Sequence, residues 1–383
     1  MMELNRFNRP ELTLRQKLWQ VQWMFVLLLC VTATIGFVML YSAGNGKFDP
    51  WSSKQIIRFG VSLALMLAVA LTDIRVWLRL SYGIYLLTLI LLIAVEFGGT
   101  IGMGAQRWID LGFINLQPSE LMKIALVLVL ARYFHGMNME ETGKARYLIP
   151  PLVMVIIPTA LVLRQPDLGT ALMLLIASSV VFFLAGVRMW KFGVVFLGGL
   201  ISMPVAWQFL KGYQKERVLT FLNPERDSLG SGYHIIQSKI AFGSGGISGK
   251  GFMQGSQSHL NFLPEKQTDF IFTMLAEEFG MAGGMALLGL YALLLAYGYA
   301  IAMRTRSQFG RLLALGVTST FFLYVFINMA MVMGLIPVVG VPLPLISYGG
   351  TAMVTLMLGF GFLLGVHVHR DTSISHHGAD DEF

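Results

Sequence analysis

The sequence has little charge and almost no cysteine. Charged residues account for only 13% of its 383 residues. The single cysteine, Cys30, lies in an apolar run, so no intramolecular disulfide can form. Hydrophobic residues make up 55% of the chain, and the mean hydropathy is +0.67. The apolar runs are long enough to cross a hydrocarbon core of roughly 30 Å, which indicates a polytopic membrane protein rather than a set of soluble domains.

Ten apolar segments are predicted to be membrane-spanning helices, from a scan with a window of about 19 residues. The predicted fold class is therefore an all-α polytopic membrane protein. An even number of spans places both ends of the chain on one side of the membrane. The first apolar run is too long for the hydrophobic region of a cleaved signal peptide, so we expect it to be retained. The predicted spans are 21–43, 56–72, 79–97, 119–135, 148–164, 170–187, 191–210, 270–302, 311–336 and 349–367.

The chain is expected to divide into three regions. Residues 1–20 form a charged N-terminal segment, 21–370 form the ten-helix transmembrane domain, and 371–383 form a short polar tail that we expect to be disordered. Within the second region, a large loop at 211–269 separates the seventh and eighth spans. No internal repeat is evident, which weakens the case for a transporter built from inverted repeats.

Basic residues gather on the side of the membrane that holds both termini. The positive-inside rule assigns that side to the cytoplasm, so the 211–269 loop is expected to face outward. This bias and the attraction to anionic lipid account for the net charge of +7, which gives no support for nucleic-acid binding. The basic clusters are Arg6/Arg9/Arg15/Lys17, Arg75/Arg79, Lys144/Arg146, Arg188/Lys191 and Arg304/Arg306/Arg311.

The segment LPEKQTDFIF at 263–272 places Asp269 between a polar loop and a strongly apolar helix. A carboxylate at the edge of the hydrocarbon is costly and usually faces a wet cavity or a partner, which makes it a candidate functional residue. Alternatively, Asp269 caps the following helix. We expect it to share one helix face with Thr273 and Glu277, and such a face must line a cavity or meet other helices. At about 50 Å, an unbroken helix over 270–302 overruns the bilayer core, so its outer end should project or bend.

Two further outward-facing turns carry charged residues. Glu120 and Lys123, at positions i and i+3, can form an ion pair on one face of the fourth span, and such a pair is often purely structural. Arg107, beside a tryptophan, is a candidate site residue or an interface anchor. Asp167, in the turn RQPDLGTA, is a candidate site residue or the cap of the sixth span.

Glycine and proline are concentrated in two outer segments. GSGGISGKG at 243–251 can bring backbone N–H groups around an anion such as phosphate, although it lacks the Walker spacing, and a flexible re-entrant turn is the alternative. The segment IPVVGVPLPLISYGGT at 336–351 has no charge. We expect it to be irregular backbone packed against protein, because lipid would not satisfy its amides. An amphipathic segment is expected around 232–242.

Five segments together resemble a known family. They are RWIDLGFINLQPSELMK, RQPDLGTA, FLNPERDSLGSGYHIIQSKIAFGSGGISGKGF, LNFLPEKQTDFIF and PLPLISYGG, in that order along the chain. Over about 20–370 the chain is similar to the SEDS family (shape, elongation, division and sporulation), and more to its RodA branch than to its FtsW branch. The family often has a basic residue and a histidine before the Thr-Asp pair, where this chain has Lys266 and Gln267.

The resemblance implies a peptidoglycan glycosyltransferase for cell elongation and rod shape. Such an enzyme polymerises lipid II at the outer face of the bacterial cytoplasmic membrane and works with a class B penicillin-binding protein that cross-links the product. It joins the 4-OH of N-acetylglucosamine to a muramyl anomeric carbon in a β-1,4 bond and releases undecaprenyl pyrophosphate. This chemistry needs a base and a cationic clamp for the departing phosphates.

The resemblance assigns the essential carboxylate to Asp269, as base or as ligand of a divalent cation such as Mg²⁺ or Mn²⁺. A flippase for lipid-linked precursors is the alternative, but few charges lie at the predicted midplane, where alternating access would need them. A non-catalytic scaffold of the elongation machinery is a third alternative. The candidate residues for binding lipid II and its pyrophosphate are Arg217, Lys123, Arg107, Glu120 and Asp167.

Overall fold

The computed structural model describes residues 13–102, 105–110, 112, 115–209, 212–223, 231–260, 262, 263 and 265–372. Its helices are α1 (Leu14–Gln20), α2 (Trp23–Ala43), α3 (Ser52–Leu71), α4 (Ile74–Gly98), α5 (Pro118–His135), α6 (Met139–Thr142), α7 (Ala145–Arg164), α8 (Leu168–Leu184), α9 (Met189–Phe209), α10 (Gly212–Leu222), α11 (Ser231–Ser244), α12 (Ser256–His259), α13 (Ile271–Arg304), α14 (Gln308–Val332) and α15 (Gly350–Val368). The strands are β1 (Thr100–Gly102), β2 (Ala105–Asp110) and β3 (Asn115–Leu116).

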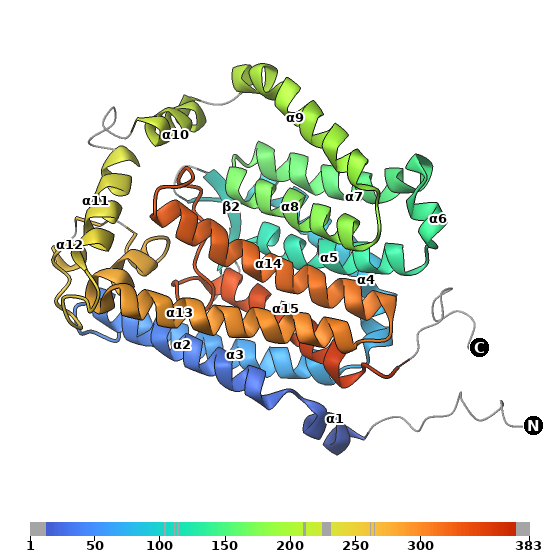
Figure 1. Ribbon diagram of the computed structural model, residues 1–383, viewed down its shortest axis with the longest axis horizontal. Coiled ribbons are helices and arrows are strands. Elements are labelled where there is room, and N and C mark those ends of the chain that lie inside the picture. Colours follow the sequence, from blue (N-terminus) through green and yellow to red (C-terminus); the bar gives the residue numbers. More distant parts are fainter. Residues whose placement is uncertain are drawn as a thin grey trace, which may run out of the picture.

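The long helices form a bundle with α11 and α12 at one end and α1 at the other (Figure 1). Two hydrogen bonds tie segments together at the α1 end. Lys17 Nζ donates to the carbonyl of Leu71 (3.1 Å), and Arg306 N donates to the carbonyl of Arg370 (3.3 Å). The α3 and α15 C-termini and the α13–α14 connection therefore lie near α1. Both described ends of the chain are thus at one end of the bundle, as an even number of spans predicts.

The long helices correspond to the predicted spans. Within the described part of the chain, ten helices have 17 or more residues, and each overlaps one predicted range. Seven of them are long and apolar enough to cross a membrane. α8 is shorter, and α5 carries Glu120, Lys123 and Arg132. The exact number of ten spans stays a prediction.

Burial differs sharply between helices. α5 is buried along nearly its whole length, and the apolar windows of α14 and α15 are 72% and 83% buried. A helix that is apolar on all sides belongs in the centre of a bundle, which is where these helices pack. α9 arches away from the bundle, and most of its described side chains are exposed (Figure 1). Charged residues on α5 are therefore shielded from lipid by the helices around them.

A small antiparallel sheet between α4 and α5 was not expected from the sequence. Its order is β1-β2-β3, with Ile101 paired to Gln106 and Ile109 paired to Leu116. These strands are only 2 to 6 residues long. Such short strands give no clear alternation of apolar and polar residues, so their periodicity could not identify them.

α13 is bent, as its length predicts. Gly280 has φ +66° and ψ −162°, outside the helical range. At this break the amides of Met281 and Ala282 donate to the carbonyls of Gly246 and Ile247, at 2.9 and 3.0 Å. A Cβ at Gly280 would lie 2.5 Å from the Ile247 carbonyl oxygen. The close approach and the positive φ both require glycine here.

The glycine-rich segment 243–251 packs against α13. The amides of Lys250 and Gly251 donate to main-chain carbonyls of α13, both at 3.0 Å. A Cβ on Gly245 would lie 2.0 Å from a carbonyl oxygen of α13, so glycine is needed for this contact. The segment is therefore neither an open phosphate cradle nor a loose turn. Before it, the expected amphipathic segment 232–242 falls within α11.

Candidate functional site

Asp269 lies in the turn that precedes α13 and is partly buried. The cap position of the helix is Phe270, which makes no side-chain cap hydrogen bond. The expected placement of Asp269 on a helix face was therefore wrong. Because Phe270 and not Asp269 occupies the cap position, the alternative that Asp269 caps the helix is not favoured either. Thr273 and Glu277 do meet other segments, as expected. Thr273 Oγ1, for example, lies 2.9 Å from Ser238 Oγ of α11.

Three consecutive main-chain carbonyls at Asp269 are held by distant parts of the chain. The donors belong to α14 and to the connection between α14 and α15, and two of the three donors are side chains. This arrangement fixes the backbone from which the carboxylate projects, which is the preorganisation that a catalytic group needs. The bonds run from Tyr348 N to Gln267 O (2.8 Å), from Ser347 Oγ to Thr268 O (2.5 Å) and from Asn328 Nδ2 to Asp269 O (3.0 Å).

The α14–α15 connection, residues 333–349, forms a frame around Asp269. It is irregular and packed against protein, as its composition predicts. Gly340 has φ +72°, and a Cβ there would lie 3.5 Å from Asp269 Oδ2. On its other side, the Val339 carbonyl oxygen would lie 2.6 Å from a Cβ on Gly169, near the start of α8. Two neighbouring residues of the frame therefore approach Asp269 and the start of α8.

α3 supports the same frame. Gln55 Nε2 donates to the Ser347 carbonyl (2.9 Å), and the Arg58 guanidinium lies 4.7 Å from the centre of the Tyr348 ring. A cavity no larger than about one water lies between the frame and the first turns of α15, with Ser347 and Met353 in its lining. The frame is thus held by α3, α14 and the Asp269 turn at once.

Glu120 and Lys123 form the predicted ion pair, with 2.6 Å between Lys123 Nζ and Glu120 Oε1. Both are buried, and the Tyr324 hydroxyl of α14 donates to Glu120 Oε2. Lys123 Nζ also lies 4.3 Å from the centre of the Tyr324 ring. Tyr324 and Asn328 are four residues apart on α14, a rise of about 6 Å. The ion pair therefore lies about one helical turn deeper in the bundle than the Asp269 turn.

Asp167 is the N-cap of α8, because its carboxylate accepts from the Thr170 amide (3.1 Å). The capping alternative is confirmed for this residue. Arg107 Nη1 lies 3.6 Å from Asp167 Oδ2, and the same guanidinium donates to the carbonyls of Gln165 (3.3 Å) and Pro166 (2.6 Å). Arg107 on β2 therefore joins the small sheet to the α7–α8 turn. Because these contacts use part of the Arg107 guanidinium, only its remaining N–H groups can bind a ligand.

Of the five candidates for binding lipid II and its pyrophosphate, the structure brings four into one region and does not describe the side chain of the fifth. Gln117 Nε2 lies 3.5 Å from Asp167 Oδ2, which connects the Arg107–Asp167 contact to the start of α5 and hence to Glu120 and Lys123. The side chain of Arg217 lies outside the described residues, although its backbone is part of α10.

Sequence reasoning missed Tyr324, Asn328 and Ser347. Each is a polar residue in an apolar or proline-rich segment, and a buried polar group needs a hydrogen-bonding partner. That rule could have marked them as contact residues, but it could not name the partners. Among the described residues, no group of three or more His, Cys, Asp or Glu side chains could hold a metal ion. A cation at Asp269 would take most of its other ligands from substrate oxygens, water or main-chain carbonyls.

Comparison with known proteins identifies the family. A family model for the cell cycle proteins FtsW, RodA and SpoVE matches residues 22–372. The chain belongs to this family. The peptidoglycan glycosyltransferase MrdB of Escherichia coli (strain K12) is 44% identical over 350 residues, which cover 90% of this chain and 93% of MrdB. Stage V sporulation protein E of Bacillus subtilis (strain 168) is 35% identical over 356 residues, 90% of this chain and 96% of that protein.

Solved structures of family members share the fold. One, from work on the structural coordination of polymerization and crosslinking by a peptidoglycan synthase complex, has a TM-score of 0.79 at 34% identity and covers 92% of this chain and 99% of its own. The rod shape determining protein RodA of Thermus thermophilus has a TM-score of 0.70 at 29% identity, with 92% and 98% covered. The resemblance to the SEDS family and the helical membrane fold are thereby confirmed.

Proposed function

We propose that this protein is a peptidoglycan glycosyltransferase that polymerises lipid II into β-1,4 glycan strands for cell elongation and rod shape. The observation that carries the proposal is the fixed backbone at Asp269, held at three consecutive carbonyls in a chain that is 44% identical to MrdB. A carboxylate in a fixed position at the end of a membrane bundle suits a reaction on a lipid-linked substrate.

The reaction needs one proton acceptor and a cationic leaving-group site. Asp269 takes the proton of the acceptor 4-OH while the oxygen of that hydroxyl forms a bond to the anomeric carbon of the donor. The bond from that carbon to the pyrophosphate oxygen breaks, and undecaprenyl pyrophosphate leaves with the electron pair. Inversion at the carbon converts the α-linked donor into a β-1,4 link.

Three cationic residues are proposed to bind the pyrophosphate. Lys123 is buried and paired with Glu120, about one helical turn deeper in the bundle than the Asp269 turn. Its ammonium is the first proposed positive charge. Arg107 is partly exposed, and its contact to Asp167 holds it near the outer end of α8. Arg217, on α10, is the third proposed clamp residue. We assign Glu120 and Asp167 the role of orienting these cations, because each lies within 4 Å of one of them.

The alternative role proposed for Asp269 is to hold a divalent cation. Its carboxylate lies beside Gly340, which has no side chain to fill the space next to it. One carboxylate together with phosphate oxygens and water is a common ligand set for Mg²⁺. When bound, Mg²⁺ or Mn²⁺ would neutralise the developing charge on the pyrophosphate, and Asp269 would hold it.

The partner proposed for this protein is a class B penicillin-binding protein that cross-links the new strands. A neighbour in structure comes from a study of a peptidoglycan synthase complex that coordinates polymerization and crosslinking, which supports such an assembly. We place the protein in the bacterial cytoplasmic membrane with both termini in the cytoplasm and Asp269 on the outer face. The location of both described ends at one end of the bundle supports placing the termini on one side, and the positive-inside rule supports the cytoplasm for that side.

Orientation is tested with single-cysteine variants in a Cys30→Ser background. Leu260 is 66% exposed at the α12 end of the bundle, and the Arg306 side chain is 73% exposed at the α1 end. A membrane-impermeant thiol reagent added to intact cells should label Leu260→Cys and not Arg306→Cys. The opposite pattern would reverse the orientation and place the site on the wrong side for lipid II polymerisation.

The activity itself is tested with purified protein and its cross-linking partner carrying an inactivated transpeptidase. Fluorescent lipid II in detergent should be extended into glycan strands that separate on a gel. Detergent offers no two sides between which to move a lipid, so a flippase would give no strands. Absence of strands under conditions where MrdB of Escherichia coli makes them would overturn the proposal.

A further inference from the structure

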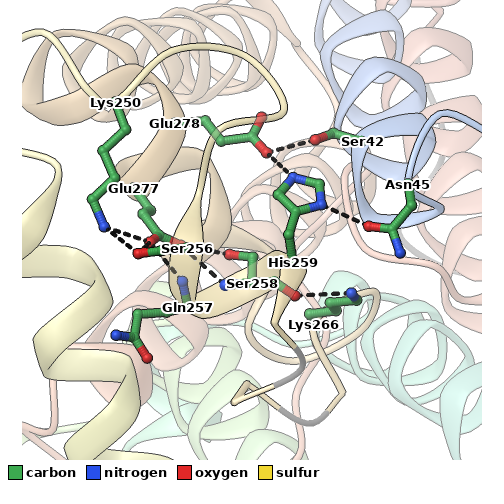
Figure 2. A network of polar contacts seen from close by, with 10 residues as sticks. All are labelled: Ser42, Asn45, Lys250, Ser256, Gln257, Ser258, His259, Lys266, Glu277 and Glu278. Atoms are coloured by element: carbon green, nitrogen blue, oxygen red, sulfur yellow. Dashed lines mark hydrogen bonds and ion pairs between the residues drawn. The ribbon is translucent and has the colours of Figure 1, made fainter.

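Glu277 is a buried carboxylate that the proposed reaction does not use. Its side chain is fully buried, and it lies in the part of α13 that precedes the break at Gly280. Figure 2 shows its contacts. Oε1 accepts from Lys250 Nζ (2.8 Å) and the Gln257 amide (2.9 Å) and lies 3.4 Å from the Ser256 hydroxyl. Oε2 accepts from the amide (3.2 Å) and the hydroxyl (2.7 Å) of Ser258. Donors therefore face both oxygens, and all of them come from 250–258.

The segment that Glu277 holds is connected to the Asp269 turn. The Ser258 carbonyl accepts from Lys266 Nζ at 2.9 Å, and Lys266 is only 6% exposed. Burial lowers the pKa of the Lys266 ammonium, because the charged form loses its hydration. The hydrogen bond to Ser258 offsets part of that loss. Lys266 is three residues before Asp269. The turn is thus held on one side by the 333–349 frame and on the other by Ser258.

Glu278, the next residue, is equally buried but has different partners. Its Oε1 accepts from the Ser42 hydroxyl of α2 (2.5 Å) and lies 3.1 Å from His259 Nε2 (Figure 2). His259 Nδ1 in turn lies 2.6 Å from Asn45 Oδ1. Glu278 therefore joins α13 to the end of α2. The two neighbouring carboxylates therefore contact different residues. Of the two, only Glu277 accepts hydrogen bonds from Ser258, and the Ser258 carbonyl accepts from Lys266 of the Asp269 turn.

We propose that Glu277 is a positioning residue for Asp269, acting through Ser258 and Lys266. A change at Glu277 should shift or loosen the turn while leaving the chemical groups at the site in place. A displacement of about 1 Å of a catalytic group can lower turnover by about a hundredfold. This inference rests on the proposed function, and one of its measurements does not depend on activity.

The first test compares Glu277→Gln with Glu278→Gln in the strand assay. Donors face both oxygens of Glu277, so the N–H₂ group of Gln at this position must point toward other donors. Gln at 278 still has an oxygen that can accept from Ser42. We expect Glu277→Gln to lower kcat at least tenfold with KM changed less than twofold, and Glu278→Gln to retain kcat within threefold. Equal losses of kcat in both variants would mean general destabilisation and would overturn the proposal.

The second test asks whether Glu277 acts through Lys266. Residues in one hydrogen-bonded network give non-additive effects, and independent residues give additive ones. Lys266→Met should lower kcat by itself, and Glu277→Gln/Lys266→Met should be no slower than the slower single variant. A double variant whose loss equals the product of the two single losses would show that the residues act independently, and the proposed route would be wrong.

The third measurement is hydrogen–deuterium exchange of the purified protein. Amides at 265–270 should exchange at least fivefold faster in Glu277→Gln than in the wild type and at the wild-type rate in Glu278→Gln. This result would support the positioning role even if the wild type made no strands, which would overturn the proposed function alone. If Glu277→Gln fails to fold, Ser258→Ala removes the hydroxyl contact and should give the same change in exchange. Unchanged exchange in whichever variant folds would overturn the inference.

Discussion

Two carboxylates in this protein, Glu120 and Asp269, have opposite surroundings. Glu120 is 5% exposed, and its oxygens contact the Lys123 ammonium and the Tyr324 hydroxyl. Asp269 is partly exposed, its main chain rather than its side chain makes the bond to Asn328, and its Oδ2 lies beside Gly340. In the first case the protein saturates the side chain. In the second it fixes the backbone and leaves a glycine next to the carboxylate.

The difference indicates that the buried pair has a structural role beside the one proposed for Lys123 at the pyrophosphate. A buried ion pair costs desolvation of both charges and is tolerated when each charge is satisfied. Glu120 and Lys123 meet that condition, so they join α5 and α14 firmly. A carboxylate that must accept a proton or hold a cation needs a fixed position together with access to substrate. The main chain of Asp269 is fixed, and the residue is partly exposed. Changes at each site should therefore fail in different ways.

The largest effect on stability is expected from breaking the buried pair on one side only. Lys123→Met leaves Glu120 without its ion partner, and removal of one partner from a buried pair typically costs about 3–5 kcal/mol. We expect a clear drop in the melting temperature in detergent. The double variant Lys123→Met/Glu120→Gln, which removes both charges, should melt at a higher temperature than Lys123→Met. A double variant that is less stable still would contradict a structural role for the pair.

A smaller effect, on turnover alone, is expected at the proposed clamp residue Arg217. Loss of a preorganised charge at developing negative charge commonly lowers kcat by about 10²–10³-fold. Arg217→Gln should therefore reduce strand formation by about a hundredfold and leave the melting temperature unchanged. Arg217→Lys should restore only part of the rate, because an ammonium cannot replace a bidentate guanidinium. Strand formation at the wild-type rate in Arg217→Gln would remove this residue from the site.

The smallest effect is expected from Gly340→Ala. Gly340 has φ +72°, and a non-glycine residue in the left-handed region costs roughly 1–2 kcal/mol. The added Cβ would also lie 3.5 Å from Asp269 Oδ2. We expect kcat to fall severalfold. Gly289→Ala is the matched control, since a Cβ at that position in α13 meets nothing within 4 Å. Equal losses in the two variants would contradict a special role for the frame.

The sequence was sufficient for features that depend on neighbouring residues. Long apolar runs located the helices because every span must satisfy its own backbone in lipid. The pairing of Glu120 with Lys123 followed from the i, i+3 spacing on one helix, and the cap at Asp167 from a turn before an apolar run. The bend in α13 followed from length alone, although only the structure located it at Gly280.

Features that depend on distant residues could not be predicted. Asn328 and Ser347 bond carbonyls that are 59 and 79 positions away, and nothing in the local sequence specifies such partners. The glycines at 243–251 are compatible both with an anion site and with close packing, and only the neighbouring backbone of α13 decides between these. Asp269 was placed on the helix face because Asp269, Thr273 and Glu277 recur every four residues, a spacing that cannot show whether the helix has already begun at the first of them.

The central claim is that the Asp269 carboxylate performs the polymerisation chemistry, and one substitution tests it most directly. Asn has nearly the same shape as Asp but is neither a base nor a good ligand for a divalent cation. Asp269→Asn should insert, fold and bind its cross-linking partner normally and make no glycan strands from fluorescent lipid II, while the wild type makes long strands. Strands of wild-type length and yield from Asp269→Asn would contradict the account.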